Sequence, residues 1–399
     1  MKILVINAGS SSIKYQLFDM PGWTILAKGM VERIGTSDAT LVHKYNGTNH
    51  TAQVEAGDHE AAMAVILSTL TDAAIGVVQD ISEIEAVGHR VVHGGEEFSG
   101  SVQIDKHVIE SIDRFADLAP LHNPPNLTGI RAAIHALPNA AQVACFDTAF
   151  HTSIPEVAYL YGLPYEIYEK YRVRRYGFHG TSHRYVARRC AKVMGVDKTQ
   201  ANIITAHLGN GCSITAVKEG KSVDTSMGLT PLEGVVMGTR CGDIDPAILF
   251  YLGDKGYDMK QLNDICNKKS GLLGISGMSN DMRNLKGLVD EGNERAKLAV
   301  DIFCYRIKKY IGTYTGVLGK LDAIVFTGGI GENGPGLRAQ ICAEQTQIGI
   351  EIDPAKNNAK SSDERLISTD ASRVKVYVIP TDEEAAIAGD TYELAIANS

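Results

Sequence analysis

Two arginines stand in short glycine-framed segments, where an ordinary surface strand or helix would not place them. Arg90 lies in G-H-R-V-V-H-G-G (88–95), and Arg240 lies in M-G-T-R-C-G-D-I-D-P (237–246). The planar fork of a guanidinium matches the oxygens of carboxylates and phosphates. Two such groups suit the binding of an anionic carboxylate next to a migrating phosphoryl group, where a well-placed arginine contributes roughly 10³–10⁵ in rate.

Histidines occur in further loops that glycine or proline bounds, in Y-G-F-H-G-T-S-H (176–183) and L-H-N-P-P-N (121–126). The H-x-x-x-H spacings of His89/His93 and His179/His183 lack both the glutamate of a zinc-protease helix and a third ligand, so we expect no zinc site. We assign His89, His93 and His183 hydrogen-bonded structural roles.

Carboxylates complete the set of reactive groups. Asp147 follows a predicted buried strand, and an acidic run, P-T-D-E-E, spans residues 380–384. Oxygen ligands of this kind hold Mg²⁺ or orient an attacking oxygen in phosphoryl transfer.

Three loops contain the small residues that let backbone N–H groups approach a phosphate, at residues 7–12, 207–213 and 327–333. None is a Walker A loop or a dinucleotide-binding loop. A single such loop is more often an ordinary turn, but three that each follow a predicted strand favour phosphate binding. Lys14 lies on the strand after the first loop, where it can reach a phosphate oxygen or remain a solvated surface charge.

The positions of these loops indicate a duplication. A strand at 3–6, the loop N-A-G-S-S-S and a strand at 13–18 return as a strand at 203–206, the loop H-L-G-N-G-C-S and a strand at 214–217. Asn7, Gly9 and Ser10 then correspond to His207, Gly209 and Asn210. A second echo pairs 143–148 with 323–328, which makes chance similarity of two hairpins less plausible. We therefore predict two similar α/β domains that face each other across a cleft.

Helices are expected between the strands. Residues 58–75 are rich in alanine, and an apolar stripe at helical spacing predicts a packed helix. The stripe consists of Ala299, Ile302, Phe303, Ile307, Tyr310 and Tyr314.

Composition fits a folded protein of two domains, with 399 residues, 44% hydrophobic and 22% charged. The net charge of −8 argues against a nucleic-acid partner or an anionic membrane. The beginning of the chain lacks the apolar stretch of a signal peptide, and no apolar run is long enough to span a bilayer. Seven scattered cysteines without a C-x-x-C pair predict reduced thiols in the cytoplasm.

These motifs and their order along the chain are similar to those of the acetate kinases. This family belongs to the superfamily that includes sugar kinases, heat-shock chaperones and actin. The resemblance runs from Asn7 to the P-T-D-E-E segment and includes, besides the motifs above, F-D-T-A-F-H, D-T-S-M-G-L-T-P-L-E-G and F-T-G-G-I-G-E-N. It implies two ribonuclease-H-like domains, 1–150 with 384–399 and 151–383, an active-site cleft between them, and a homodimer. It also implies reversible, Mg²⁺-dependent transfer of the ATP γ-phosphoryl group to acetate, with Mn²⁺ able to replace Mg²⁺ and ADP and acetyl phosphate as products.

The resemblance also implies roles for individual residues. Asp147, His179 and Arg240 would be catalytic, and Asn7 and Glu383 would hold the metal. Arg90 would bind the substrate carboxylate, beside a small pocket that comprises Val92, Leu121, His122, Phe178 and Pro231. The nucleotide would contact Lys14, His207, Leu208, Gly209, Asn210, Gly211, Asp281, Met282, Arg283, Gly329, Ile330, Gly331, Glu332 and Asn333.

Three departures from the family pattern are visible: Asp382 replaces an asparagine common in relatives, and Cys212 and Cys241 replace small residues. Asp382 would add a charge near the metal site. Valine rather than alanine at position 92 favours acetate over propionate. One alternative is a propionate or butyrate kinase. The other, from a different class, is a nucleotide-driven binding module like the chaperone and actin branches. The arginine and histidine loops argue against such a module, because it has no second anionic substrate to neutralise.

Overall fold

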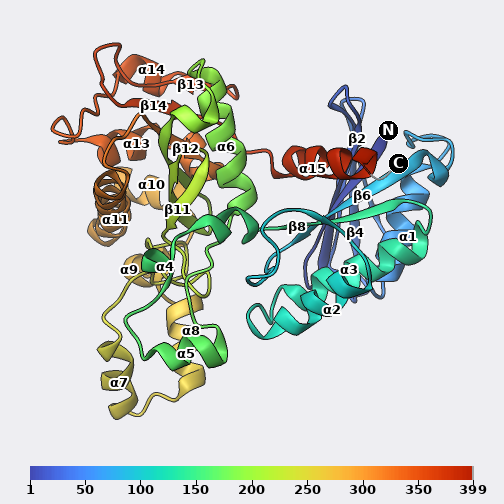
Figure 1. Cartoon of the computed structure of the whole chain (residues 1–399), viewed down its shortest axis with the longest axis horizontal. Helices are drawn as coiled ribbons and strands as arrows, with labels where there is room; N and C mark the ends of the chain where they lie inside the picture. Colours follow the sequence, from blue (N-terminus) through green and yellow to red (C-terminus); the bar gives the residue numbers. More distant parts are fainter. Residues whose placement is uncertain (398–399) are drawn as a thin grey trace. The chain divides into compact units, whose positions relative to one another are not determined.

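The chain divides into two units in the computed structural model, which describes residues 1–397. Unit 1 comprises Met1–Thr152 and Asp382–Ser399, and unit 2 comprises Ser153–Thr381. Residues 398 and 399, the end of the predicted segment 384–399, lie outside the described residues. Each unit contains one β-sheet with helices packed against it (Figure 1).

The sheet of unit 1 has eight strands in the order β5-β4-β3-β2-β1-β6-β8-β7. Strands β1 and β2 form an antiparallel hairpin, whereas β1, β6 and β8 run parallel, so the carboxyl ends of these three strands meet at one edge. The strands are β1 (Lys2–Ala8), β2 (Ser12–Asp19), β3 (Thr24–Glu32), β4 (Thr40–Tyr45), β5 (Thr48–Gln53), β6 (Ile84–Val91), β7 (Val102–Gln103) and β8 (Ala141–Phe146).

Helices cover both faces of this sheet, because the buried side chains of β1 alternate between them. Ile3 and Val5 pack with residues of α15, whereas Leu4 and Ile6 pack with residues of α1 and α3. Gly88 on β6 allows α15 to come close, since a Cβ there would lie 2.4 Å from Thr391 Oγ1. The helices and 3₁₀ turns are α1 (His59–Leu70), η1 (Ile81–Glu83), α2 (Lys106–Arg114), η2 (Phe115–Asp117), α3 (Asn123–Ala136), η3 (Ala149–Ser153) and α15 (Glu383–Ala397).

The sheet of unit 2 has six strands in the order β11-β10-β9-β12-β14-β13. Helices α6 and α11 lie on opposite sides of it (Figure 1). The strands are β9 (Asn202–Leu208), β10 (Cys212–Lys218), β11 (Lys221–Thr225), β12 (Ala323–Thr327), β13 (Arg365–Leu366) and β14 (Lys375–Val378).

The helices of unit 2 include the one stretch that the sequence predicted as helical in this half. The apolar stripe from Ala299 to Tyr314 lies on α11, where most of its members are buried, so this prediction is confirmed. The helices and turns are α4 (Glu156–Tyr159), α5 (Tyr165–Tyr171), α6 (Gly180–Val193), η4 (Lys198–Gln200), α7 (Ala247–Asp254), α8 (Met259–Lys268), α9 (Gly271–Ser276), α10 (Met282–Asp290), α11 (Glu294–Leu318), α12 (Gly328–Asn333), α13 (Pro335–Cys342) and α14 (Pro354–Asn358).

The two sheets confirm the predicted duplication. Strands β3-β2-β1-β6-β8 correspond in order and direction to β11-β10-β9-β12-β14. The first hairpins close in the same way, because Gly9 N donates to Ser12 O at 2.8 Å and Gly209 N donates to Gly211 O at 3.1 Å. The second predicted echo, 143–148 with 323–328, was wrong. Strand β12 pairs directly with β9, as β6 does with β1, so β12 corresponds to β6 and β8 corresponds to β14.

Among residues 1–397, no helix combines the length and apolar character that crossing a membrane requires.

His89 on β6 is buried among apolar residues, with its Nε2 2.8 Å from Gln142 Oε1. Burial disfavours the charged imidazolium and lowers the pKa of His89 to about 4, although the hydrogen bond to Gln142 opposes the shift. The expected structural role of this histidine is confirmed.

We predict that His89 makes the free energy of unfolding depend on pH. Below pH 6.5 the unfolded chain protonates this histidine, whereas the folded chain keeps it neutral down to about pH 4, so stability present above pH 6.5 is lost as the pH falls. The loss between pH 7 and pH 5 is about 2 kcal/mol. Urea unfolding of the wild type and of His89→Gln at both pH values measures it, and equal pH dependence in the two proteins would contradict it.

Candidate active site

Arg90 and Asp147 form an ion pair at the carboxyl ends of β6 and β8 in unit 1. Arg90 Nη2 lies 2.6 Å from Asp147 Oδ2, and its Nε lies 3.2 Å from both carboxylate oxygens. Asp147 is 2% exposed, and its backbone N–H donates to Val91 O at 2.9 Å. The charge of Asp147, followed by that of Glu383, raises the pKa of Arg90. A fixed positive group therefore lies next to a buried carboxylate.

Glu383 joins this pair from the first residue of α15. Its Oε2 lies 3.6 Å from Arg90 Nε. Burial raises the pKa of Glu383 to about 7, the nearby charges of Asp147 and Glu384 add to the shift, and Arg90 and Lys14 oppose it. A cation close to Glu383 would therefore favour its charged form and lower this pKa.

Asp382 has a different task from Glu383. Its Oδ1 accepts a hydrogen bond from Ala385 N at 2.8 Å, which caps the beginning of α15. The Asp382 carboxylate, which we expected to add a charge near the metal site, is thus hydrogen-bonded to the backbone at the beginning of α15.

Asn7 and Lys14 are opposite each other in the β1–β2 hairpin, one pair away from its loop. Asn7 is half-buried, and the exposed Lys14 is close enough to Glu383 to stabilise its charged form. The loop between them contains the hydroxyls expected to face a phosphate.

Two asparagines that the sequence analysis had left without a role tie these strand ends together. Asn126 Oδ1 accepts from Val92 N at 3.0 Å, while its Nδ2 donates to Ala8 O at 2.7 Å. Asn123 holds the backbone of His93 through both its N–H and its carbonyl. Both asparagines are buried on the first turn of α3. Their i, i+3 spacing in N-P-P-N was the sequence feature from which this role could have been predicted.

The predicted pocket residues of unit 1 differ in exposure. Val92 is 9% exposed and lies directly after β6, whereas Leu121 is 74% exposed. His122 is exposed and precedes α3. Of the two apolar residues in this set, Val92 is therefore packed into unit 1, whereas the Leu121 side chain is mostly exposed to solvent.

In unit 2, a chain of hydrogen bonds leads from His179 into the protein. His179 Nδ1 lies 2.8 Å from Ser213 Oγ, and the same oxygen lies 2.7 Å from His183 Nε2. His183 Nδ1 lies 2.7 Å from Thr205 Oγ1, which confirms its structural role. His179 itself has a left-handed backbone with φ 56°, a strained conformation for a non-glycine residue. Its ring orientation is thus set by both backbone and side-chain partners.

The ring of His207 stacks on that of His179, with 4.3 Å between the ring centroids. Its Nδ1 lies 2.8 Å from Ser182 Oγ, which is in turn 2.8 Å from Thr381 Oγ1. His207 and Leu208 are the last residues of β9, so only residues 209–211 form the predicted loop.

Arg240 lies beside this histidine pair. A Cβ on Gly211 would lie 3.4 Å from His179 Cε1 and 3.5 Å from Arg240 Nη1, so both side chains flank that glycine. Arg240 Nη1 donates to Pro231 O at 3.1 Å, and burial lowers the pKa of Arg240. Phe178, the residue before His179, is buried. The structure therefore brings His179, Arg240 and the 209–211 turn together within unit 2.

The segment 329–333, which we predicted as a loop, is helical in the structure. Residues Gly328–Asn333 form the short helix α12 directly after β12. Glu332 turns back along it, since its Oε1 accepts from Gly328 N at 2.9 Å and from Thr381 N at 3.3 Å. A helix can begin directly after β12 because Glu332 accepts a hydrogen bond from Gly328 N, a backbone group that has no partner within the helix.

Asp281 caps helix α10, because its Oδ1 accepts from Arg283 N at 2.8 Å. Its carboxylate also pairs with the Arg283 guanidinium at 2.6 Å, and this hydrogen bond lowers the pKa of Asp281 to about 2. Met282 is buried, whereas Arg283 is exposed. The guanidinium at this end of α10, that of Arg283, is therefore exposed but already paired with the Asp281 carboxylate.

The acetokinase family model matches residues 2–389 of this sequence. The chain belongs to the acetokinase family. It is 53% identical over 395 residues to the acetate kinase of Pseudothermotoga lettingae, which covers 99% of this chain and 97% of that protein. It is 55% identical over 393 residues to the acetate kinase of Halothermothrix orenii, which covers 98% of each.

Solved structures of family members agree. The crystal structure of Porphyromonas gingivalis acetate kinase matches 98% of this chain and 99% of that chain, with a TM-score of 0.95 and 47% identity. The crystal structure of a propionate kinase from Francisella tularensis matches the same shares of both chains, with a TM-score of 0.91 and 44% identity. The predicted family and the α/β class with two related domains are confirmed.

Within this family member, hydroxyl groups are the site residues that sequence reasoning missed. Ser182, Thr205 and Ser213 contact the histidines directly, although motifs containing two of them had been noted. Ser213 and Thr215 alternate with apolar residues on β10, and that alternation was the available signal for Ser213.

Proposed function

We propose that the protein transfers the γ-phosphoryl group of ATP reversibly to acetate, giving ADP and acetyl phosphate. The observation that carries this proposal is the Arg90–Asp147–Glu383 cluster, in a chain whose relatives are named acetate kinases. The Asp147 contacts use Arg90 Nε and Nη2, so Nη1 is left to donate to a substrate carboxylate. A propionate kinase is the second candidate, because one solved relative bears that name.

Mg²⁺ is the cation that fits the cluster in unit 1, with Mn²⁺ as a substitute. Carboxylate and amide oxygens are hard ligands, and Mg²⁺ in phosphoryl-transfer sites is held through one or two carboxylates together with substrate phosphates. Glu383 and Asn7 would hold it, and a cation there would offset the cost of ionising the buried Glu383 carboxylate. When bound, the ion neutralises charge on the phosphate oxygens.

The chain's own residues perform the remaining tasks. Arg90 orients the acetate carboxylate, and Asp147 keeps the guanidinium in position. A carboxylate oxygen attacks the γ-phosphorus in line, a new O–P bond forms, and the bond to ADP breaks. Because a carboxylate is already anionic, it needs no general base. The main barrier is repulsion between two anions, which positively charged and hydrogen-bonding groups lower.

Arg240 and His179 supply those groups from unit 2. Both flank Gly211, where the backbone can approach a phosphate. We infer that they stabilise the transferring phosphoryl group while Lys14 and the 209–211 turn contact the nucleotide phosphates. Residues 329–333 of α12 are a further proposed contact of the phosphates, and Asp281, Met282 and Arg283 are the proposed contacts of the adenosine.

Choice of acetate over propionate is proposed to depend on Val92, Phe178 and Pro231. In a hydroxylamine assay with Mg-ATP, acetate should give the most hydroxamate and propionate less. One methylene is worth only about 1–3 kcal/mol, so propionate should not be excluded. Val92→Ala should raise the propionate-to-acetate ratio of kcat/KM about tenfold.

A reaction without carboxylate is the control for ATP hydrolysis. Absence of hydroxamate with every acid would refute the proposed function and favour a nucleotide-driven binding module. An unchanged ratio in Val92→Ala would remove that residue from the pocket.

Substitution of the two arginines should change different kinetic parameters. Arg90→Ala should raise the acetate KM at least about tenfold, because a charged hydrogen-bond donor to the substrate is lost. Arg240→Ala should lower kcat by roughly 10³-fold, because its contact develops with the transferring phosphoryl group. Steady-state kinetics with acetate and ATP varied separately distinguish these effects. If both variants kept wild-type kcat/KM, the assignment would be wrong.

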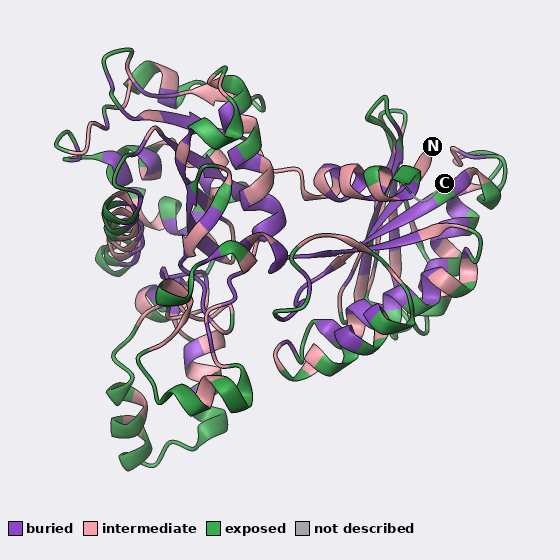
Figure 2. Cartoon of the chain, in the orientation of Figure 1, coloured by how far each residue is buried: buried purple, intermediate pink, exposed green. Residues whose placement is uncertain are grey.

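We propose that the protein acts as a homodimer in the cytoplasm, where its seven free cysteines stay reduced. Helix α7 has no buried residue, and Phe250 and Tyr251 on it are 75% and 61% exposed. Figure 2 shows the exposed surface of this helix. Apolar side chains gathered in this way are typical of a surface that another subunit covers.

Light scattering should give the wild type twice the 43.0 kDa chain mass. Phe250→Glu should shift the mass toward one chain, because a charge is costly in an apolar interface. Leu298→Glu is the matched control, since Leu298 is 52% exposed on a different helix. A wild-type mass of one chain would refute the dimer.

A further inference from the structure

Arg240 and Pro231 both lie in a long segment without helix or strand, between the end of β11 at Thr225 and the beginning of α7 at Ala247. A loop of this length costs considerable conformational entropy to hold in one conformation. A catalytic guanidinium loses most of its effect when it is misplaced by about 1 Å. Something in the protein must therefore keep this loop rigid.

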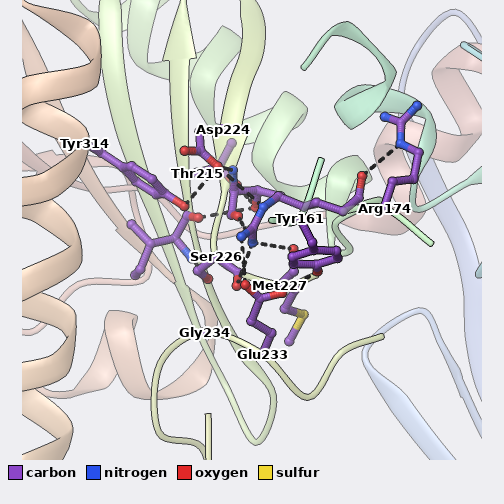
Figure 3. A network of polar contacts seen from close by, with 12 residues as sticks. Tyr161, Arg174, Thr215, Asp224, Ser226, Met227, Glu233, Gly234 and Tyr314 are labelled. Carbon is purple, nitrogen blue, oxygen red and sulfur yellow. Dashed lines mark hydrogen bonds and ion pairs between the residues drawn. The ribbon is translucent and has the colours of Figure 1, made fainter. Parts of the chain in front are cut away.

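The Arg175 side chain contacts the beginning of the loop. Figure 3 shows Ser226 and Met227 of the loop close to Tyr161 and Glu233. Its Nη1 donates to three successive carbonyls, of Thr225 at 2.7 Å and of Ser226 and Met227 at 3.2 Å each. Its Nη2 donates to Glu233 Oε1 at 2.7 Å. One guanidinium thus joins the last residue of β11 and the first two loop residues to a carboxylate several positions further along.

Tyr161 completes the connection. Its hydroxyl donates to Glu233 Oε2 at 2.5 Å and accepts from Leu229 N at 3.0 Å. Gly228 leaves the room for this contact, since a Cβ there would lie 1.7 Å from Glu233 Oε2 and 2.2 Å from the Tyr161 hydroxyl. The first glycine of G-L-T-P-L-E-G is therefore required by the glutamate of the same motif.

The loop is held a second time where it returns. Asp243 Oδ1 accepts from Gly234 N at 2.8 Å, and its Oδ2 accepts from the Tyr310 hydroxyl at 2.6 Å. Gly234 has φ 110°, which favours glycine. The residues next to Glu233 are thus connected to helix α11.

Pro231 lies between these two attachments, and its carbonyl accepts from Arg240 Nη1. We propose that Glu233, held by Arg175 and Tyr161, is a positioning residue that sets the place of Pro231 and, through its carbonyl, the direction of the Arg240 guanidinium. This deepens the proposed function and rests on it, because Arg240 is assigned there to the transferring phosphoryl group.

Tyr161→Phe and Glu233→Gln test the proposal, because each keeps its side-chain volume and removes part of the connection. With acetate and ATP varied separately, kcat should fall about threefold in Tyr161→Phe and about tenfold in Glu233→Gln. The ATP KM should change less than twofold. The double variant should resemble Glu233→Gln alone, since both residues act through one bond. In an Arg240→Lys background, Glu233→Gln should change kcat less than twofold.

Tyr15→Phe is the matched control. It removes another buried tyrosine hydroxyl, 2.7 Å from His43 Nδ1 in unit 1, and should lower the thermal midpoint with unchanged kcat and KM. Wild-type kinetics in folded Tyr161→Phe and Glu233→Gln would overturn the proposal, and so would an undiminished effect of Glu233→Gln in the Arg240→Lys background.

A second readout is independent of turnover. The rate at which phenylglyoxal modifies Arg240, followed by peptide mass spectrometry, should rise at least threefold in Tyr161→Phe over the wild type. An unchanged rate would overturn the positioning role even if the wild type formed no acyl phosphate. Absence of acyl phosphate from the wild type would refute the proposed function alone.

Discussion

The ion pair between Arg90 and the buried carboxylate of Asp147 is the interaction on which unit 1 depends. A carboxylate that is 2% exposed is stable only when it is paired and hydrogen-bonded, and the guanidinium of Arg90 provides both. Glu383 lies beside this pair, and its burial disfavours a further negative charge and raises its pKa, although Arg90 opposes the shift. A cation bound there would offset part of the cost of ionising this carboxylate.

Parallel strand ends explain why three groups so distant in sequence meet. Arg90 and Asp147 come from β6 and β8, which are neighbours in the sheet, and Glu383 begins the helix that packs on the same strands. That they share one site was implied by the resemblance to the acetate kinases. The distances did not follow, because the close approach of α15 depends on Gly88 and on the cap that Asp382 provides.

Unit 2 shows where sequence reasoning reached its limit. The duplication predicted the β9–β10 hairpin, since the pattern of apolar residues and glycines repeats. The second echo was assigned to the wrong strand because a short buried run has the same composition in β6, β8 and β12, and only pairing in the sheet separates them. Residues 329–333 read as a loop because glycine-rich segments usually are. The hydrogen bond from Gly328 N to Glu332 made a helix there instead, and no local propensity indicates such a contact.

The two units thus hold their positive groups by different means. In unit 1, a regular strand carries Arg90, so the sheet itself restricts the backbone and few further contacts are needed. In unit 2, Arg240 stands on an irregular loop, and the restriction must come from side chains that bridge distant parts of the chain, such as Arg175 with Glu233 and Tyr310 with Asp243. Such buried bridges are sensitive to small changes, because removal of one partner leaves the other charge or hydroxyl without compensation. The glycines of G-L-T-P-L-E-G therefore serve the carboxylate beside them, and the motif is best understood as the support of an arginine that lies seven residues further along the chain.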